Sequence, residues 1–322
     1  MRRHTTTAAV LAAAALTLAA CGSEDPFEEE TSADAPDDAG ESGSETGSDG
    51  PGAAGETVVV GSQAYYSNEI IAEIYAQVLE DAGYGVERQF QIGQRDVYLQ
   101  AMEGGEVDVL PEYTGNLLQF YAPDTEARAS EDVAAELERA LPEGMAVLEY
   151  SEAQDADSYN VTAEFSEENG ITSLADLAEY DGEITVGGNA ELEERPYGPA
   201  GLEEFYGVEV EFLAIGDSGG PLTKGAILDG TITMGDIYTA DPDLASGDFV
   251  TLEDPESMIL AQNVVPLVPE DLSGELGEVL DPVSEALTTS ELIELNARSV
   301  EEQLDSATIA TDWLAENDLG GN

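Results

Sequence analysis

Histidine and cysteine are almost absent from this 322-residue sequence, which has one of each, His4 and Cys21. His4 lies in a leader that we expect to be removed, so the mature chain has no histidine. This excludes Ser-His-Asp and Cys-His catalytic arrangements and histidine-ligated zinc or iron. A single cysteine also excludes an internal disulfide and a thiolate cluster. We therefore predict a protein that is not an enzyme and that has no cofactor and no metal site.

Basic residues are scarce too, with nine Lys and Arg against 70 Asp and Glu and a net charge of −61. Nucleic acid is excluded as a partner, because binding phosphates requires Lys and Arg that displace counterions. Residues 57–322 alone carry seven basic and 58 acidic side chains. We interpret this charge as halophilic adaptation of a secreted protein, since salt screens self-repulsion. The alternative, an acidic calcium-binding protein, lacks an EF-hand loop pattern.

Long hydrophobic runs are missing as well. The apolar stretch at residues 8–20 is too short to span a bilayer, and it follows Arg2 and Arg3. A basic start, a short apolar run and small residues are typical of a secretory signal. Residues 18–21 (LAAC) resemble the bacterial lipoprotein box, in which the cysteine is lipidated and becomes the new N-terminus. We predict a lipoprotein signal peptide at residues 1–20 and an extracytoplasmic protein anchored to the outer face of the cell membrane through Cys21. The alternative is an ordinary signal peptide.

The segment that follows has little with which to form a core. Residues 22–56 contain twelve acidic residues, no basic residue and one aromatic, Phe27. Such a composition cannot bury enough apolar surface to offset its ordering entropy, and its like charges extend it. We predict a disordered acidic tether over residues 21–56.

The remainder alternates between strand and helix patterns. Strands are expected at residues 57–61, 86–91, 107–110, 183–187, 208–215 and 231–236. Helices are expected at residues 68–82, 96–103, 174–180, 200–206 and 221–228, and three more near 269–287, 290–296 and 307–316. This alternation predicts an α/β protein with mostly parallel sheets, in two lobes with a ligand cleft between them. The only tryptophan, Trp313, is interpreted as a core residue of the last helix.

One motif points to a function that the composition excludes. Residues 216–222 (GDSGGPL) match the active-site serine motif of trypsin-like proteases. That chemistry requires a histidine base beside the serine, and the mature chain has none. We interpret the motif as a glycine-rich loop that enters a helix at Pro221, a favoured first helical residue.

Several other stretches together resemble the substrate-binding proteins of osmoprotectant ABC importers, which bind glycine betaine, choline, carnitine or proline betaine. The stretches are VGSQ (residues 60–63), GGEVDVLPEYTG (104–115), ERPYG (194–198) with FYG (205–207), GDIYTADP (235–242) and LIELN (292–296). The likeness covers residues 58–319, and PEYTG is its most specific part.

The resemblance implies a two-lobed type II periplasmic-binding-protein fold. Lobe 1 would comprise residues 57–160 and 264–322, and lobe 2 residues 161–263. It also implies a cage of tyrosine rings, formed here by Tyr113, Tyr159 and Tyr238. A quaternary ammonium group cannot donate hydrogen bonds and is best held by ring faces, each contributing about 0.5–2 kcal/mol.

Other site residues follow from the same resemblance. Gln63 and Asn116 would meet the polar end of the ligand, and Arg195 would pair with a carboxylate. The place of a fourth cage aromatic holds Gln262, so Tyr66 or Tyr197 is expected to supply the missing wall.

The function implied is an extracytoplasmic receptor that binds a quaternary ammonium osmoprotectant and delivers it to an ABC permease. The alternative is a receptor for another small solute, such as an amino acid or a polyamine, on the same fold.

Overall fold

The computed structural model describes residues 57–321. The expected signal peptide (residues 1–20), the lipidated Cys21 and the acidic tether (residues 21–56) lie outside this range, and they stay predictions.

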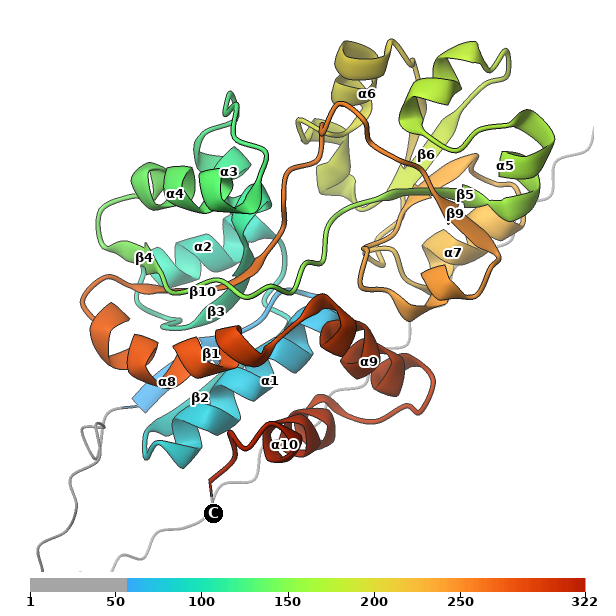
Figure 1. The fold of residues 1–322 in the computed structure, drawn as a ribbon. Coiled ribbons are helices and arrows are strands. Elements are labelled where there is room, and N and C mark those ends of the chain that lie inside the picture. Colours follow the sequence, from blue (N-terminus) through green and yellow to red (C-terminus); the bar gives the residue numbers. More distant parts are fainter. Residues whose placement is uncertain (1–56, 322) are drawn as a thin grey trace, which may run out of the picture. The chain divides into compact units, whose positions relative to one another are not determined.

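The described chain begins with a βαβ unit in the first lobe (Figure 1). β1 (Thr57–Gly61) pairs in parallel with β2 (Gly85–Gln89), and α1 (Tyr66–Asp81) connects the two strands. The apolar stripe of α1 is buried from Ile70 to Leu79. The expected strand at residues 57–61 and the helix at residues 68–82 are thereby confirmed.

A second, antiparallel sheet completes the first lobe. Its order is β3-β10-β4, so a strand from late in the chain lies between two early ones. The strands of this sheet are β3 (Leu110–Tyr113), β4 (Met145–Val147) and β10 (Val264–Pro269). The helices in this part of the lobe are α2 (Arg95–Glu103), α3 (Thr114–Tyr121) and α4 (Ser130–Ala140). β3 starts later than the strand expected at residues 107–110, because its partner β10 pairs with residues 110–113. Helix α4 was not predicted, since it buries only Val133 and Leu137.

The second lobe contains a five-stranded sheet of order β7-β6-β8-β5-β9. The strands are β5 (Tyr159–Thr162), β6 (Thr185–Gly188), β7 (Glu211–Ala214), β8 (Met234–Asp236) and β9 (Phe249–Thr251). β6 runs parallel to β7 and β8, whereas β5 runs antiparallel to β8 and β9. The expectation of mostly parallel sheets is therefore wrong. The reason is that β5 brings the chain into this lobe and β9 precedes its exit, and neither needs a helical crossover to reach its neighbour.

The helices of the second lobe are short. They are α5 (Ala163–Asn169), η1 (Leu174–Glu179), η2 (Ala190–Glu194), α6 (Pro199–Tyr206), α7 (Pro221–Leu228) and η3 (Pro242–Ala245). α6 and α7 both begin with proline after a glycine, which agrees with the expected helix start at Pro221. The helix expected at residues 174–180 is a 3₁₀ helix.

Two segments carry the chain between the lobes, and they lie side by side (Figure 1). Gln154 forms an antiparallel bridge with Asn263, and the N–H of Asp155 donates to the carbonyl of Gln262 over 3.2 Å. The expected boundary at residue 160 falls inside β5, which pairs only with strands of the second lobe. The side chains on these connecting segments are therefore placed where both lobes can meet them.

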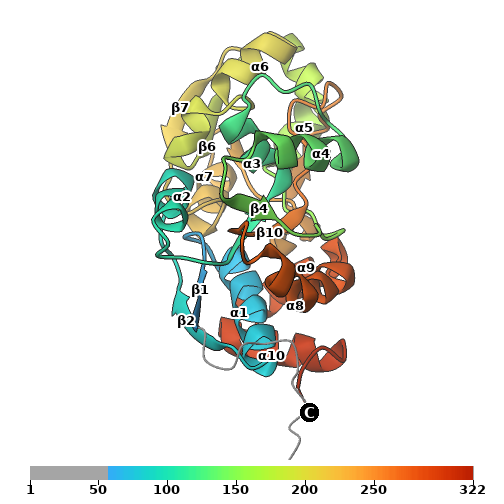
Figure 2. The ribbon, with the colours of Figure 1, turned by 90° about the vertical axis from the view of Figure 1, so that its left-hand side faces the viewer.

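The C-terminal helices return to the first lobe (Figures 1 and 2). α8 (Ser273–Ala286), α9 (Thr289–Val300) and α10 (Ser306–Glu316) all contact α1. Trp313 is buried on α10 within the first-lobe core cluster, together with Ile309 and Leu314. The prediction that Trp313 is a core residue is confirmed.

Candidate ligand-binding site

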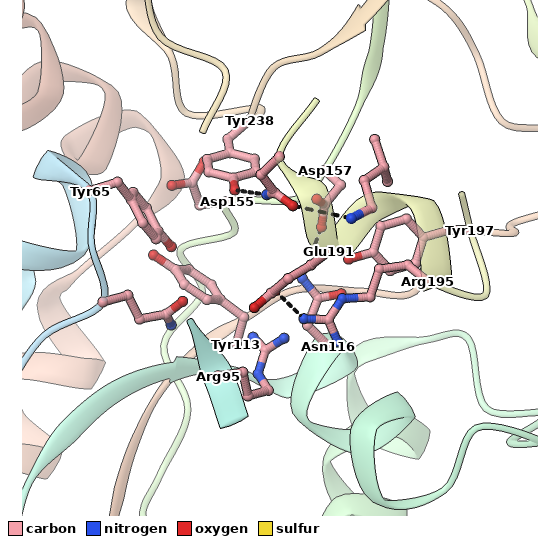
Figure 3. A pocket seen from close by; sticks show the side chains of 13 residues that line it. Tyr65, Arg95, Tyr113, Asn116, Asp155, Asp157, Glu191, Arg195, Tyr197 and Tyr238 are labelled. Atoms are coloured by element: carbon pink, nitrogen blue, oxygen red, sulfur yellow. Dashed lines mark hydrogen bonds and ion pairs between the residues drawn. The ribbon is translucent and has the colours of Figure 1, made fainter. Parts of the chain in front are cut away.

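A cavity is lined by residues from both lobes and from the connecting segment between them (Figure 3). It contains about 420 Å³ of space between atoms, part of which is open to solvent. Its lining consists of Gln63, Tyr65, Arg95, Tyr113, Asn116, Asp155, Asp157, Asn189, Glu191, Leu192, Arg195, Tyr197 and Tyr238.

Three tyrosine rings form one wall of the cavity. The ring centroids of Tyr65 and Tyr113 lie 6.5 Å apart with their planes at 24°, and those of Tyr65 and Tyr238 lie 5.3 Å apart at 57°. They come from the loop after β1, the end of β3 and the segment after β8. Burial raises the pKa of all three phenols, so the rings are uncharged. Such a wall presents electron-rich ring faces to a cation.

A fourth tyrosine, Tyr197, also lines the cavity, whereas Tyr159 does not. Tyr159 is buried in the second-lobe core cluster, and its hydroxyl donates to the backbone carbonyl of Tyr197 over 2.7 Å. Its side chain points from β5 into the core of the lobe. The expected cage position of Tyr159 is corrected: Tyr197 lines the cavity and Tyr159 lies behind it.

Two carboxylates from the connecting segment face the cavity near the tyrosine wall. Asp155 accepts hydrogen bonds from the Ser67 hydroxyl and the Ala240 N–H, each over 3.0 Å. Burial nevertheless raises the pKa of Asp155 to about 7. The carboxylate of Asp157 accepts from the Asn116 amide over 2.8 Å. These groups add negative charge to the part of the cavity where the ring faces gather.

Gln262 holds Asn116 rather than closing the cage. Its side-chain oxygen accepts from the Asn116 backbone N–H over 2.8 Å, and its amide donates to the Asn116 side-chain oxygen over 2.9 Å. Gln262 is fully buried and does not line the cavity. An aromatic residue there could not make this paired contact, so Gln262 determines where the Asn116 amide points.

Two arginines, Arg95 and Arg195, lie on the side of the cavity away from Tyr238 in Figure 3. Arg95 is held by Glu112 through two hydrogen bonds, of 2.8 and 3.1 Å. The hydroxyl of Tyr98 donates to the same carboxylate over 2.6 Å. Burial alone would lower the pKa of Arg95, but Glu112 raises it, so the guanidinium stays charged. Arg195 forms an ion pair with Glu191, four residues earlier in the chain.

Residues of the PEYTG stretch (residues 111–115) contact several other segments of the chain. The carbonyl of Pro111 accepts from the side chain of Asn68 over 2.9 Å, and more weakly from that of Gln63 over 3.4 Å. Thr114 bonds the segment that leads into β10. Gly115 lies so close to that segment that a Cβ would be 2.6 Å from the Ala261 carbonyl oxygen. The stretch therefore joins the cavity wall to the crossover between the lobes.

The GDSGGPL loop supports the segment that carries Tyr238. Asp217 accepts from the Thr223 hydroxyl over 2.6 Å at the start of α7, and a Cβ on Gly219 would lie 3.0 Å from the Ile237 Cα. Gly219 also has a φ of +77°, which favours glycine. Lys224 on α7 pairs with Asp241, just beyond Tyr238, over 2.9 Å. The loop is a structural support, as the missing histidine indicated.

The structure brings six predicted residues to one cavity: Gln63, Tyr113, Asn116, Arg195, Tyr197 and Tyr238. Tyr66 begins α1 and does not line the cavity, whereas its neighbour Tyr65 does. Tyr65, Arg95, Asp155, Asp157, Asn189, Glu191 and Leu192 were missed. The only signal for Tyr65 was its place two residues after Gln63.

Within residues 57–321, no helix is both long and apolar enough to span a membrane. In the same range no group of three or more His, Cys, Asp or Glu side chains is placed to hold a metal ion.

Two lobes of α/β structure and a shared small-molecule cavity define the class of solute-binding proteins. The particular family follows from sequence: residues 56–316 match the substrate-binding domain of ABC-type glycine betaine transport systems, and the chain belongs to this family. The expected family and fold are confirmed, and so is the prediction that the protein is not an enzyme, because the family binds substrates for transport.

Relatives cover nearly the whole described chain. The chain is 27% identical over 276 residues to the glycine betaine-binding protein YehZ of Escherichia coli strain K12, covering 81% of this chain and 90% of the relative. It is similar to the structure of apo YehZ from Escherichia coli, with 26% identity and a TM-score of 0.59 over 82% of this chain and 99% of the other. A structure of a glycine betaine/carnitine/choline ABC transporter protein aligns with a TM-score of 0.66 at 15% identity, over 81% of this chain and 99% of the other, which supports the fold alone.

Proposed function

We propose that this protein binds a small quaternary ammonium osmoprotectant, of which glycine betaine and choline are the representative ligands. The observation that carries the proposal is the two-ended cavity. The rings of Tyr65, Tyr113 and Tyr238 lie in one part, near the Asp155 and Asp157 carboxylates. Arg95 and Arg195 lie in another part, and the Tyr197 ring lies beside Arg195. Ring faces and negative charge suit a cation without N–H groups, and a guanidinium suits a carboxylate. Relatives that are named glycine betaine-binding proteins support the same ligand class.

The residue roles follow from the cavity lining. Tyr65, Tyr113, Tyr197 and Tyr238 are proposed to surround the ammonium group. The polar end of the ligand is assigned to Asn116 and Arg195, with Gln63 at the rim of the same cavity. Tyr159 is assigned a supporting role, because its hydroxyl holds the backbone of Tyr197.

Calorimetric titration of the purified protein in high salt tests the ligand class. Glycine betaine and choline are expected to bind. Their analogues 3,3-dimethylbutanoate and 3,3-dimethylbutanol have a neutral carbon in place of the quaternary nitrogen. These analogues keep the shape without the cation and are not expected to bind. Glycine and putrescine complete the panel. If putrescine or glycine binds more tightly than both quaternary ligands, the polyamine or amino-acid alternative replaces this proposal.

Arg195→Ala separates the two ends of the ligand. This change is expected to weaken glycine betaine by roughly tenfold or more, because it removes a charge-assisted contact to a carboxylate. Choline has no carboxylate that could lose a partner, and removing a cation from the cavity should leave its affinity unchanged or raise it. Equal losses for the two ligands would contradict the assignment of Arg195 to the carboxylate.

We further propose that the protein acts outside the cytoplasm as a lipoprotein, and that it delivers its ligand to an ABC permease. The family supports the transport role, and the LAAC stretch before and including Cys21 supports the anchor. The full chain should partition with membranes, and Cys21→Ala should release it or leave the precursor uncut. An unmodified thiol at Cys21 in the mature wild-type chain would contradict the anchor without affecting the ligand proposal.

A further inference from the structure

The carboxylate of Glu191 lies inside the ligand cavity. Glu191 belongs to the 3₁₀ helix η2, and its side chain lines the cavity together with Tyr113 and Arg195. Figure 3 shows it extending across the cavity toward Tyr113, with its carboxylate bonded to the Arg195 guanidinium. The Glu191 carboxylate therefore already pairs with Arg195, the arginine that is proposed to bind the carboxylate of a betaine.

The two cavity arginines differ in how firmly they are held. The Arg95–Glu112 pair is almost fully buried, with side chains 6% and 0% exposed, and it is also held by Tyr98. The Arg195–Glu191 pair is 16% and 24% exposed. Within residues 57–321, Glu191 is the only carboxylate within ion-pair distance of Arg195. Opening the Arg195 pair thus costs far less than opening the Arg95 pair, because its partners regain water readily.

The backbone around Glu191 need not move for its side chain to leave. Asn189 caps η2 by accepting the N–H of Leu192 over 3.1 Å, and its amide donates to the Tyr238 hydroxyl over 3.2 Å. A second, more open hollow shares Arg95, Glu191 and Arg195 with the ligand cavity and continues to Gln94 and Glu194. The Glu191 side chain can therefore rotate into this solvent-filled hollow.

From these contacts we propose that Glu191 is an internal competitor for the ligand carboxylate and thereby determines ligand specificity; this rests on the proposed function. In the structure Glu191 pairs with Arg195. A zwitterion such as glycine betaine must displace it, since two carboxylates cannot share one exposed edge of the guanidinium without repulsion. A cation without a carboxylate, such as choline, leaves the pair intact and gains the nearby negative charge. Glu191 therefore disfavours zwitterions and favours cations.

Glu191→Gln tests this by predicting changes of opposite sign. Glycine betaine should bind roughly three- to tenfold more tightly, since no charge competes for Arg195. Choline should bind roughly two- to fivefold more weakly, since one negative charge leaves the cavity. Glu193→Gln is the matched control: it makes the same change in net charge on an exposed side chain of η2. It should leave both affinities within twofold.

A second variant, Glu191→Asp, separates charge from contact. The shorter side chain keeps the negative charge but no longer reaches Arg195, so betaine should still gain affinity while choline loses less than in Glu191→Gln. The affinities of both ligands should be measured by titration for the wild type, Glu191→Gln, Glu191→Asp and Glu193→Gln. Parallel shifts of the two ligands in Glu191→Gln, or no shift beyond the Glu193→Gln control, would overturn the proposal. Binding of neither ligand to the wild type would instead overturn the proposed function.

Discussion

Tyr65 and Tyr66 are neighbours in the chain, yet only Tyr65 lines the cavity. Both rings pack partly against the first-lobe core, and Tyr66 is the first residue of α1. The extended backbone of Tyr65, with φ −147° and ψ 155°, turns its ring toward Tyr113 and Tyr238. At the scale of the residue, one step along the chain thus decides which ring can meet a cation.

This pair gives a matched test of the tyrosine wall. Tyr65→Ala should weaken choline by about 0.5–2 kcal/mol, or roughly 2- to 30-fold, because one ring face is lost. Tyr65→Phe should cost less, since the ring remains. Tyr66→Ala changes the adjacent tyrosine outside the cavity and should alter the affinity little. Calorimetry measures the affinities, and circular dichroism verifies that each variant is folded. Equal losses of choline affinity in Tyr65→Ala and Tyr66→Ala would contradict the proposal that the Tyr65 ring contacts the cation.

Asp155 should make both stability and binding depend on pH. Burial raises its pKa from 3.8 to about 7, and the Asp157 and Asp241 charges act in the same direction. The folded ligand-free protein therefore holds this proton more tightly than the unfolded chain does. The resulting stabilisation is complete below about pH 4 and is lost as the pH rises to about 7, by up to about 1.4 kcal/mol per pH unit.

The measurement compares the wild type with Asp155→Asn, which cannot titrate. Between pH 5 and pH 8 the melting temperature of the wild type should fall relative to that of the variant. A cation favours the ionised carboxylate, so choline should bind the wild type more tightly at pH 8 than at pH 5.5, with proton release. Asp181→Asn, on an exposed surface residue, should keep the wild-type pH dependence. An unchanged pH profile in Asp155→Asn would refute this role.

At the scale of elements, the site depends on where β3 passes into α3. Consecutive residues there have different partners: Tyr113 lines the cavity, whereas Thr114 and Gly115 both contact the Ala261 backbone in the crossover segment. Asn116 follows and is held by Gln262. Because β3 pairs with β10, this turn and the crossover segment are fixed against each other, and with them the Asn116 amide that lines the cavity.

Gly115→Ala tests this contact between elements. The added Cβ would lie 2.6 Å from the Ala261 carbonyl oxygen and from the Gln262 amide, so the variant should lose about 1–3 kcal/mol of stability. It should also weaken ligand binding by displacing Asn116. Gly225→Ala is the control, since Gly225 lies within α7 with nothing within 4 Å of a Cβ. That variant should be neutral or up to about 1 kcal/mol more stable. The melting temperatures of Gly115→Ala and Gly225→Ala should be compared by thermal unfolding. Equal values would contradict the close approach of Gly115 to the crossover segment.

At the scale of the whole molecule, charge dominates. Residues 57–322 carry 58 acidic and seven basic side chains. Five of the basic side chains are already engaged in ion pairs within the described range: Arg88, Arg95, Arg195, Lys224 and Arg298. Most carboxylates are therefore left without a basic partner, and the folded molecule is subject to strong self-repulsion.

The melting temperature should consequently rise with salt. The Debye length shrinks from about 10 Å at 0.1 M to about 3 Å at 1 M, which relieves repulsion between exposed carboxylates. Unfolding should be followed from 0.1 to 2 M NaCl and, separately, with choline chloride, where ligand binding adds its own stabilisation. A melting temperature that stays flat or falls in NaCl would contradict the interpretation of the acidity as halophilic adaptation.

The sequence by itself determined the class of protein and much of its architecture. The scarcity of histidine and cysteine, one residue of each, excluded Ser-His-Asp and Cys-His catalytic arrangements, and the local spacing of apolar residues was sufficient to predict α1, α7 and β1. Six cavity residues were found because PEYTG and its companion stretches carry a family's pattern within a few residues of chain. These features depend on composition or on neighbours in sequence, which a sequence displays directly.

Only the tertiary structure decided the remainder, because it depends on contacts between distant segments. The direction of β5 follows from its pairing with β8, between residues 75–77 positions apart, and the central place of β10 from its pairing with β3, between residues 151–157 positions apart. Tyr197 takes the cavity position expected for Tyr159 because β5 points the Tyr159 ring into the second-lobe core. Arg95 and Glu191 enter the same cavity from different lobes, and no local pattern marks either of them. Which side chains face a ligand is set by how two lobes meet, and that is a property of the folded chain.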